Sequence, residues 1–315
     1  MQKKKRKHKV LKIIGLIILI GIVLLAIRLV MNAKHQERQQ ELMVKTDEQL
    51  IGSHFYIPRD GKEEVDVNLY MLDDGETHPL VINLHGGAFI AGDADTLDTQ
   101  SDRISRQWNV QVVTVNYKLA SGNYSIAYGT EEVVDTVKYM AAHADEYHID
   151  PERIFILGYS AGGYHAMASV LKLEQEGIDI AGQIICYGFI KEVNDTYLAQ
   201  DEIFRQSMCP SLFILADNDP ISEGSLQYQQ SLEANGVETQ VKKYDGAIHG
   251  FIEENNPEYE ILDAMSKSPE QETMARDAEQ LIGEWIRGLV LEDRNDLNRT
   301  FDPAPVSEIR CGGFG

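Results

Sequence analysis

The sequence predicts an α/β fold in which a mostly parallel sheet carries helices on both faces. Short apolar segments typical of strands alternate along the chain with longer segments of helical spacing. The first two strand-like segments are joined by a short turn, which predicts an antiparallel edge on the N-terminal side of the sheet. With 315 residues and 43% hydrophobic content, the chain is large and apolar enough to bury the core of such a sheet.

The first part of the predicted sheet begins after residue 50. Residues 65–72 alternate apolar and polar side chains, as a half-buried strand does. The turn Pro58-Arg59-Asp60-Gly61 separates this strand from the one before it. Helices are expected at 130–142, where one broad face is apolar, and at 161–173. The strands expected in this part are 54–57, 65–72, 80–84, 110–115 and 154–157.

The second part of the chain continues the alternation and ends in a long helix. A helix is expected at 225–234, ended by Asn235-Gly236. The last helix has a clear start, with Ser268 as N-cap, Pro269 in the first turn and Gln271 completing a capping box. Residues 291–315 are polar, which predicts an irregular tail. The strands expected here are 184–187, 212–215 and 239–244.

The N-terminus has the pattern of a membrane anchor. Residues 13–27 carry no charge, and the stretch 10–31 is long enough to cross a bilayer. Seven basic residues and no acidic one lie within the first 12 positions, so the positive-inside rule places this end in the cytoplasm. A cleaved secretory signal would have a shorter apolar core that ends in small residues, unlike this run.

This pattern divides the chain into four parts. We expect a basic cytoplasmic tip and transmembrane anchor over 1–31, a linker or stalk helix over 32–50, a folded domain over 51–290 and a polar tail over 291–315. The protein would then be a single-pass protein of the cell membrane with its folded domain outside the cytoplasm.

Charge and cysteine content exclude several classes of protein. The net charge is −21, and the segment after the basic cluster carries −28, so the body of the protein would repel a phosphate backbone and nucleic-acid binding is not expected. Three cysteines, Cys186, Cys209 and Cys311, show no CxxC spacing and no histidine at metal-ligand spacing. We therefore expect no disulfide framework and no metal site built on these cysteines.

The segment Gly158-Tyr159-Ser160-Ala161-Gly162-Gly163 contains the pattern G-x-S-x-G between an expected strand and an expected helix. In this context the pattern indicates a sharp turn that exposes a nucleophilic serine, here Ser160. Flanking glycines allow the neighbouring backbone to pass close to the strained serine. The alternative is a glycine-rich turn of purely structural role.

A second glycine motif, His85-Gly86-Gly87, follows the expected strand at 80–84. The amides of Gly86 and Gly87 can point at a developing oxyanion, with the amide of Ala161 as a third donor. Side chains at these two positions would block that approach. We expect His85 to orient the loop through a hydrogen bond rather than to act as a base.

The two motifs together resemble those of the hormone-sensitive-lipase-type esterases and their bacterial carboxylesterase and acetylesterase relatives. The resemblance covers about residues 50–290 and implies the α/β-hydrolase fold, with a triad in the chain order Ser, Asp, His. Asp219-Pro220 resembles the family's Asp-Pro, which carries the acid, and His249-Gly250-Phe251 resembles its His-Gly-Phe, which carries the base. The implied triad is Ser160, Asp219 and His249.

Asp217 is the alternative to Asp219 as the acid, because it lies nearer the expected strand end but lacks the following proline. A simple Asp/Asn/Pro turn and a surface histidine at 249 are the corresponding structural alternatives. The four motifs in the family's order favour the catalytic interpretation.

The sequence departs from the family pattern at two places. Tyr159 stands where many members have an acidic residue, and Ser121 stands where relatives often have a proline. A large helical cap is missing, and only 190–208 can form a small lid, which suggests an open site for a bulky or polymer-attached ester. These features favour short acyl groups, on a small molecule or on carbohydrate.

The function expected from the resemblance is hydrolysis of carboxylic esters through an acyl-enzyme, without cofactor. Three alternatives stay open: a peptidase or formamidase on the same fold, an acyltransferase of the cell envelope, and an inactive hydrolase fold that serves as a membrane-tethered binding module. The oligomeric state is not predicted.

Overall fold

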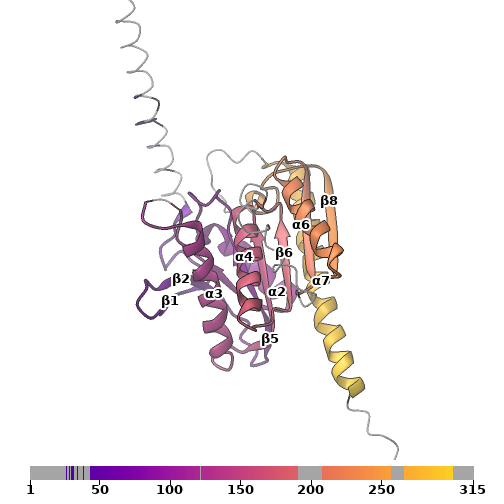
Figure 1. The fold of residues 1–315 in the computed structure, drawn as a ribbon. Coiled ribbons are helices and arrows are strands. Elements are labelled where there is room, and N and C mark those ends of the chain that lie inside the picture. Colours follow the sequence, from indigo (N-terminus) through magenta and orange to yellow (C-terminus); the bar gives the residue numbers. More distant parts are fainter. Residues whose placement is uncertain are drawn as a thin grey trace, which may run out of the picture.

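The computed structural model describes residues 43–120, 122–190, 208–256 and 266–300. It also describes six positions from Ala26 to Arg38, and it describes the side chains of the last helix as far as Leu291. Within these ranges one sheet holds eight strands in the order β1-β2-β4-β3-β5-β6-β7-β8. Helices cover both faces of this sheet (Figure 1). The predicted α/β class with a mostly parallel sheet is therefore confirmed.

The strands pair as the sequence pattern predicts. β1 and β2 pair antiparallel, β2 also pairs antiparallel with β4, and the remaining neighbours are parallel. The antiparallel edge is therefore confirmed. The strands are β1 (Ser53–Ile57), β2 (Val65–Tyr70), β3 (His78–Leu84), β4 (Gln111–Val115), β5 (Ile149–Tyr159), β6 (Gly182–Cys186), β7 (Ser211–Asn218) and β8 (Thr239–Ile248).

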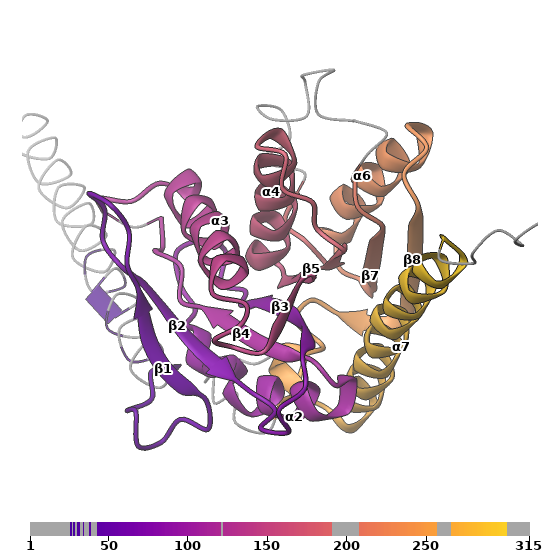
Figure 2. The same cartoon turned by 90° about the horizontal axis from the view of Figure 1, so that it is seen from below.

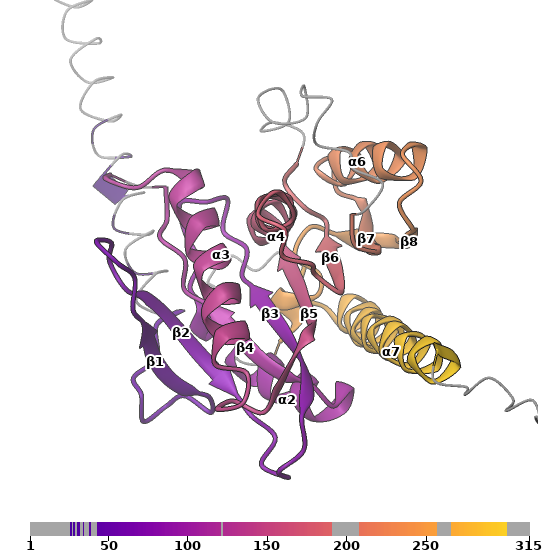
Figure 3. The ribbon, with the colours of Figure 1, turned by 60° about the horizontal axis from the view of Figure 1, so that its bottom comes forward.

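The helices form a layer on each side of the sheet. α3, α4 and α6 cover one face, while α2 and α7 cover the other (Figure 2). α6 and α7 lie on opposite sides of β7 and β8 (Figure 3). The helical segments are η1 (Ala94–Leu97), α2 (Asp98–Trp108), α3 (Ile126–Ala142), α4 (Ala161–Gln175), α6 (Ser222–Ala234), η2 (Glu253–Asn255) and α7 (Pro269–Thr300).

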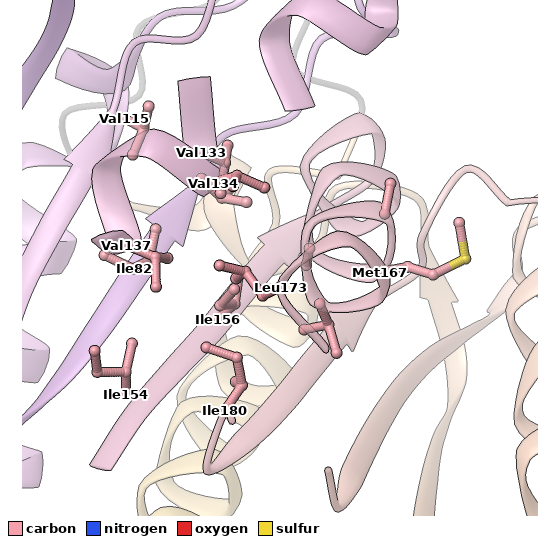
Figure 4. Close-up of a cluster of buried hydrophobic side chains, with 14 of the residues drawn as sticks. Ile82, Val115, Val133, Val134, Val137, Ile154, Ile156, Met167, Leu173 and Ile180 are labelled. Atoms are coloured by element: carbon pink, nitrogen blue, oxygen red, sulfur yellow. The ribbon is translucent and has the colours of Figure 1, made fainter. Parts of the chain in front are cut away.

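The alternation of side chains along each central strand builds two cores. In β5, Ile154 and Ile156 pack toward α3 and α4, while Phe155 and Leu157 pack toward α2 and α7. Figure 4 shows Ile156 among the side chains of the first core. Full burial of one such side chain stabilises the fold by about 1.5–3 kcal/mol. Strands buried on both faces in this way carry the parallel part of the sheet.

Helix α2 and the preceding η1 are not expected from the sequence, because much of the buried face of α2 is polar. Asp98, Gln100 and Ser101 are buried and form hydrogen bonds to distant side chains. Gln100, for example, donates to Glu279 of α7 over 2.8 Å. Apolar residues alone do not mark this helix, because its buried face holds only Ile104 and Trp108 beside the polar groups.

The last helix departs from the prediction in two ways. The irregular tail predicted from residue 291 is wrong as far as Thr300, because α7 continues to that residue and neither proline nor glycine interrupts the chain after Gly288 before Pro303. Ser268 caps the helix through a 3.2 Å hydrogen bond from the Gln271 amide. The predicted capping box is only half formed, because the Gln271 side chain bonds the backbone at the end of β8 instead.

Residues 44–52, directly before β1, pack on the domain. A stalk helix over 32–50 is wrong from Val44 onward, where the chain leaves the helical conformation of Met43. The Lys45 amide donates to Asp95 over 2.7 Å, and the amides of Ile51 and Gly52 donate to Asp98. These polar contacts replace the hydrogen bonds that a helix would supply.

Two predicted segments lie largely outside the part of the chain that the structure describes. They are the anchor at 10–31 and the small lid at 190–208. Where helices are described, none combines the length and apolarity that crossing a bilayer requires.

Candidate active site

Ser160 lies on a sharp turn between β5 and α4. Its backbone has φ 51° and ψ −113°, a conformation that non-glycine residues rarely adopt. A Cβ on Gly158 would lie 2.1 Å from the carbonyl oxygen of Gly162, and a Cβ on Gly162 would lie 2.3 Å from that of Leu84. Both glycines are therefore required by close backbone contacts, and the predicted strand–turn–helix context is present.

The structure brings Ser160, His249 and Asp219 into one hydrogen-bonded series. His249 Nε2 lies 2.9 Å from Ser160 Oγ, and His249 Nδ1 lies 2.8 Å from Asp219 Oδ2. The three residues follow the carboxyl ends of β5, β8 and β7, respectively, so the parallel strands deliver them to the same edge of the sheet. In this arrangement the hydroxyl can donate to Nε2 while Nδ1–H donates to the carboxylate.

The two candidate acids of the β7 end have different surroundings. Asp219 is buried, and its carboxylate also accepts hydrogen bonds from the Ile221 amide over 2.9 Å and the Ser222 hydroxyl over 3.2 Å. Asp217 is exposed, and its hydrogen bond with Lys243 lowers the pKa of its carboxyl. Asp219 rather than Asp217 contacts the imidazole, as the Asp-Pro motif implies.

His249 is held in a partly buried position where two effects on its pKa oppose each other. Burial lowers the pKa of the imidazole, but the hydrogen bond and the charge of Asp219 outweigh it, so that the pKa is raised above its ordinary value. The ring keeps access to solvent on one side, with 35% of its side chain exposed. A substrate could therefore reach the serine–histidine pair.

The glycine loop after β3 lies against the serine. A Cβ on Gly86 would lie 3.4 Å from Ser160 Cβ, so this part of the loop borders the candidate nucleophile. Gly87 has φ 124°, and a Cβ there would lie 1.9 Å from the carbonyl oxygen of Ala91. Ala161 begins α4 directly after Ser160, at a helix N-terminus whose amides have no intrahelical partner.

His85 takes the orienting position expected of it. Its Nδ1 lies 2.6 Å from the carbonyl oxygen of Gly86, and its ring stacks on Tyr117 with centroids 4.2 Å apart. Tyr117 in turn donates to the carbonyl oxygen of His85 over 2.7 Å. Burial lowers the pKa of His85 to about 4, which keeps the ring neutral. His85 supports the loop and forms no hydrogen bond to Ser160 or His249.

Sequence reasoning missed two buried residues beside the site, Tyr187 and Glu253. Tyr187 follows β6, and its hydroxyl donates to Glu253 Oε2. Glu253 begins η2, four residues after His249, and only 4% of it is exposed. The available signal was a pair of glutamates, Glu253 and Glu254, directly after the apolar residues that follow the His-Gly motif. That signal is weak without the structure.

No metal site emerges from the part of the chain that the structure covers. There, no group of three or more His, Cys, Asp or Glu residues could hold a metal ion. The two cysteines in these ranges, Cys186 and Cys209, are buried thiols. Burial raises the pKa of both groups well above the ordinary value, so they stay protonated.

Comparison with known proteins agrees with the observed fold. The family described as alpha/beta hydrolase fold matches residues 81–208 and 196–253. Acetyl esterases of Salmonella paratyphi A and Salmonella typhi are 28% identical to the chain in an alignment 208 residues long that covers 54% of this chain. The match spans 64% of the length of each of these relatives.

Solved structures share the fold at low sequence identity. An esterase of Pyrobaculum calidifontis superimposes with a TM-score of 0.64 at 22% identity, covering 82% of this chain and 92% of the other. An esterase of Rhizomucor miehei gives 0.66 at 20% identity, covering 84% and 91%. A thermostable carboxylesterase from a metagenomic library gives 0.63 at 23% identity, covering 82% and 95%. At these identities the likeness shows the fold alone.

Proposed function

Because the chain belongs to the alpha/beta hydrolase fold family, we propose that it is a serine esterase that hydrolyses carboxylic esters through Ser160, His249 and Asp219. The observation that carries the proposal is the hydrogen-bonded series from the serine hydroxyl through the imidazole to the buried carboxylate. The acetyl esterases among the relatives support ester hydrolysis in particular. The glycine loop beside the serine supplies the remaining requirement, a site for a developing negative charge.

The proposed reaction begins with attack of Ser160 Oγ on the ester carbonyl carbon while His249 Nε2 takes the hydroxyl proton. Asp219 orients the imidazole and stabilises the imidazolium. The electron pair of the carbonyl moves to its oxygen, where the amides of Gly86, Gly87 and Ala161 can donate. Loss of one such donor costs about 2.7–4 kcal/mol of transition-state stabilisation.

The second half of the reaction regenerates the serine. The imidazolium of His249 returns its proton to the leaving alcohol as the tetrahedral intermediate collapses to an acyl-enzyme. Water then attacks the acyl carbon with His249 again as base, and the carboxylic acid leaves. The chemistry requires only groups of this chain, the ester and water.

For the substrate, we propose an ester of a short acyl group, carried by a small molecule or by carbohydrate. The named activity of the Salmonella relatives, acetyl ester hydrolysis, supports a short acyl group.

We also propose that residues 10–31 anchor the protein in the cell membrane, with the cytoplasmic tip before them and the hydrolase domain on the outer side. The apolar run and the basic cluster before it support this location.

The test of the activity uses the full-length chain and its Ser160→Ala variant. We expect the wild type to react with a fluorophosphonate probe and to hydrolyse p-nitrophenyl acetate faster than the decanoate. The variant should not be labelled and should lose at least about 10⁴-fold in kcat, because both steps need the hydroxyl. Wild-type protein that is neither labelled nor active would contradict the proposal and favour an inactive binding module.

Two further substrates separate the alternatives on the same fold. A p-nitroanilide or formamide cleaved faster than the matched ester would indicate a peptidase or formamidase. An added alcohol that captures the acyl group in preference to water would indicate an acyltransferase.

The proposed membrane location has its own test. Protease added to intact cells should digest the hydrolase domain while the N-terminal tip stays protected.

A further inference from the structure

Glu253 occupies a buried position between two parts of the candidate site. Its Oε1 lies 3.3 Å from the position that a Cβ on Gly86 would take, and Ser160 Cβ lies 3.4 Å from that same position. Its other oxygen, Oε2, accepts the hydroxyl of Tyr187. The carboxyl group therefore bridges the glycine loop and the end of β6, close to the candidate nucleophile.

Tyr187 connects this carboxyl group to the imidazole. Its ring meets that of His249 edge-on, with centroids 5.2 Å apart and an interplanar angle of 68°. Its hydroxyl also lies 3.3 Å from the Ile252 amide, which donates to it. Tyr187 is fully buried and has φ 39°, a strained conformation that its surroundings must maintain.

The burial of Glu253 is not balanced by a lysine or an arginine among the described residues. Among the lysines and arginines that the structure describes, none pairs with Glu253, whereas the buried Glu132 of α3 has Arg59 at 3.7 Å. Burying a carboxyl group without a cation is costly, and an apolar side chain would fill the same space more favourably. Such groups are enriched at functional sites.

We propose that Glu253 is a positioning residue for the triad. Glu253 acts through the ring of Tyr187 to hold the imidazole of His249, and it sets the charge beside that imidazole. The kinetic part of this inference rests on the proposed esterase function. The effect on the imidazole itself does not, because it follows from the contacts and charges of the folded protein.

The charge of Glu253 depends on pH. Burial raises the pKa of its carboxyl to about 7, against the opposing effects of the Tyr187 hydrogen bond and the charge of His249. When ionised, Glu253 raises the pKa of His249 through its charge. The titratable groups that face Glu253 are His249 and Glu254 of its own loop, Cys186 and Tyr187 of the β6 end, Tyr159 of β5 and Tyr117 after β4.

The coupling between Glu253 and His249 determines the direction in which the pKa of His249 moves when Glu253 is substituted. Glu253→Gln keeps the size of the side chain but removes the negative charge and replaces one acceptor oxygen with an amide donor. The imidazolium of His249 is then stabilised less, so the pKa of His249 should fall. A residue with a purely structural role would leave the midpoint of this titration in place.

The first experiment measures the imidazole directly. The full-length chain is labelled with ¹³C at histidine Cε1, and the His249 signal is identified by its absence from a His249→Gln variant. We expect the midpoint of the His249 titration to lie at lower pH in Glu253→Gln than in the wild type. Glu132→Gln is the matched control, because burial raises the pKa of Glu132 to about 7 as well but Glu132 does not face His249. Equal midpoints in wild type and Glu253→Gln would overturn the inference.

The second experiment measures hydrolysis of p-nitrophenyl acetate by the variants whose thermal unfolding is unchanged. Both Glu253→Gln and Tyr187→Phe should lower kcat by about tenfold with KM within about twofold, because misplacement of the imidazole affects the chemical step. Unchanged kcat in both variants would overturn the positioning role. If the wild type itself is inactive, the proposed function fails, while the imidazole titration still decides the effect of Glu253 on His249.

Discussion

The interior of the sheet and its carboxyl edge differ in side-chain packing and in backbone conformation. In the interior, β3 and β5 alternate apolar side chains between two cores in ordinary extended backbone. At the edge, where the same strands end, Ala88, Phe89 and Ser160 have φ values of 52°, 67° and 51°. Tyr187 at the end of β6 has φ 39°. Positions that the backbone disfavours therefore gather around the candidate nucleophile.

The difference shows that the free energy gained by packing in the interior offsets backbone strain at the edge. Each strained residue costs on the order of 1–3 kcal/mol, and the buried strands behind it must offset that cost. A change at the edge should therefore alter activity more than it alters folding, whereas a change in the interior should do the reverse. The following predictions test this contrast, starting with the largest expected effect.

The strongest contrast at the edge is between the two aspartates after β7. Asp219→Asn removes the carboxylate that holds the His249 tautomer, so kcat for p-nitrophenyl acetate should fall by about 10⁴-fold. Asp217→Asn disrupts only an exposed ion pair with Lys243 and should leave kcat within about twofold. Steady-state kinetics of both variants checks the pair. Comparable losses in the two would show that the imidazole is not held as described.

Gly87 tests the glycine loop. A Cβ at this position would lie 1.9 Å from the carbonyl oxygen of Ala91, so Gly87→Ala must displace the loop, and kcat should fall by about 10²–10³-fold. Gly236 has φ 83° and open space around it, so Gly236→Ala should lower only the free energy of unfolding, by about 1 kcal/mol. Urea unfolding and kinetics measured together separate the two. An active Gly87→Ala enzyme would mean that this loop is not part of the reaction.

The pH dependence of hydrolysis tests the electrostatics of the edge. Only neutral His249 can accept the serine proton, so kcat/KM should fall tenfold per pH unit below the pKa of that imidazole. Because Asp219 outweighs burial and raises this pKa, the midpoint of the acid limb should lie above 6.5. A rate profile from pH 5 to 9 gives the midpoint. A midpoint below 6.5 would mean that burial, which lowers the pKa, dominates instead.

The smallest effect on activity is expected in the interior. Ile156 lies in the core between β5 and the α3–α4 layer, so Ile156→Val should lower the free energy of unfolding by about 0.5–1.5 kcal/mol. The turn at Ser160 lies beyond the end of this packed strand, and kcat should stay within about twofold. Urea unfolding gives the first value and ester hydrolysis the second. A tenfold loss of kcat would show that the interior and the edge are coupled more tightly than the contrast implies.

Much of the fold could be predicted because its signals are local. The alternation in β2, the apolar run of β5 and the cap at Ser268 are each encoded within a few neighbouring residues. The glycines at 158 and 162 are also a local signal, and they predict the turn at Ser160. A close backbone contact excludes a side chain at both positions. For the acid and the base, the Asp-Pro and His-Gly-Phe motifs identified Asp219 and His249 by resemblance alone.

The amino-acid sequence by itself thus determined the order of the strands, most of the helices and the residues that follow the strands at the candidate site. Only the tertiary structure decided which aspartate contacts His249, that the polar face of α2 is buried, and that Glu253 and Tyr187 lie beside the imidazole. The physical reason is distance along the chain. Gln100 and Glu279, or Tyr187 and Glu253, become neighbours only when the sheet assembles, so neither local segment indicates its partner.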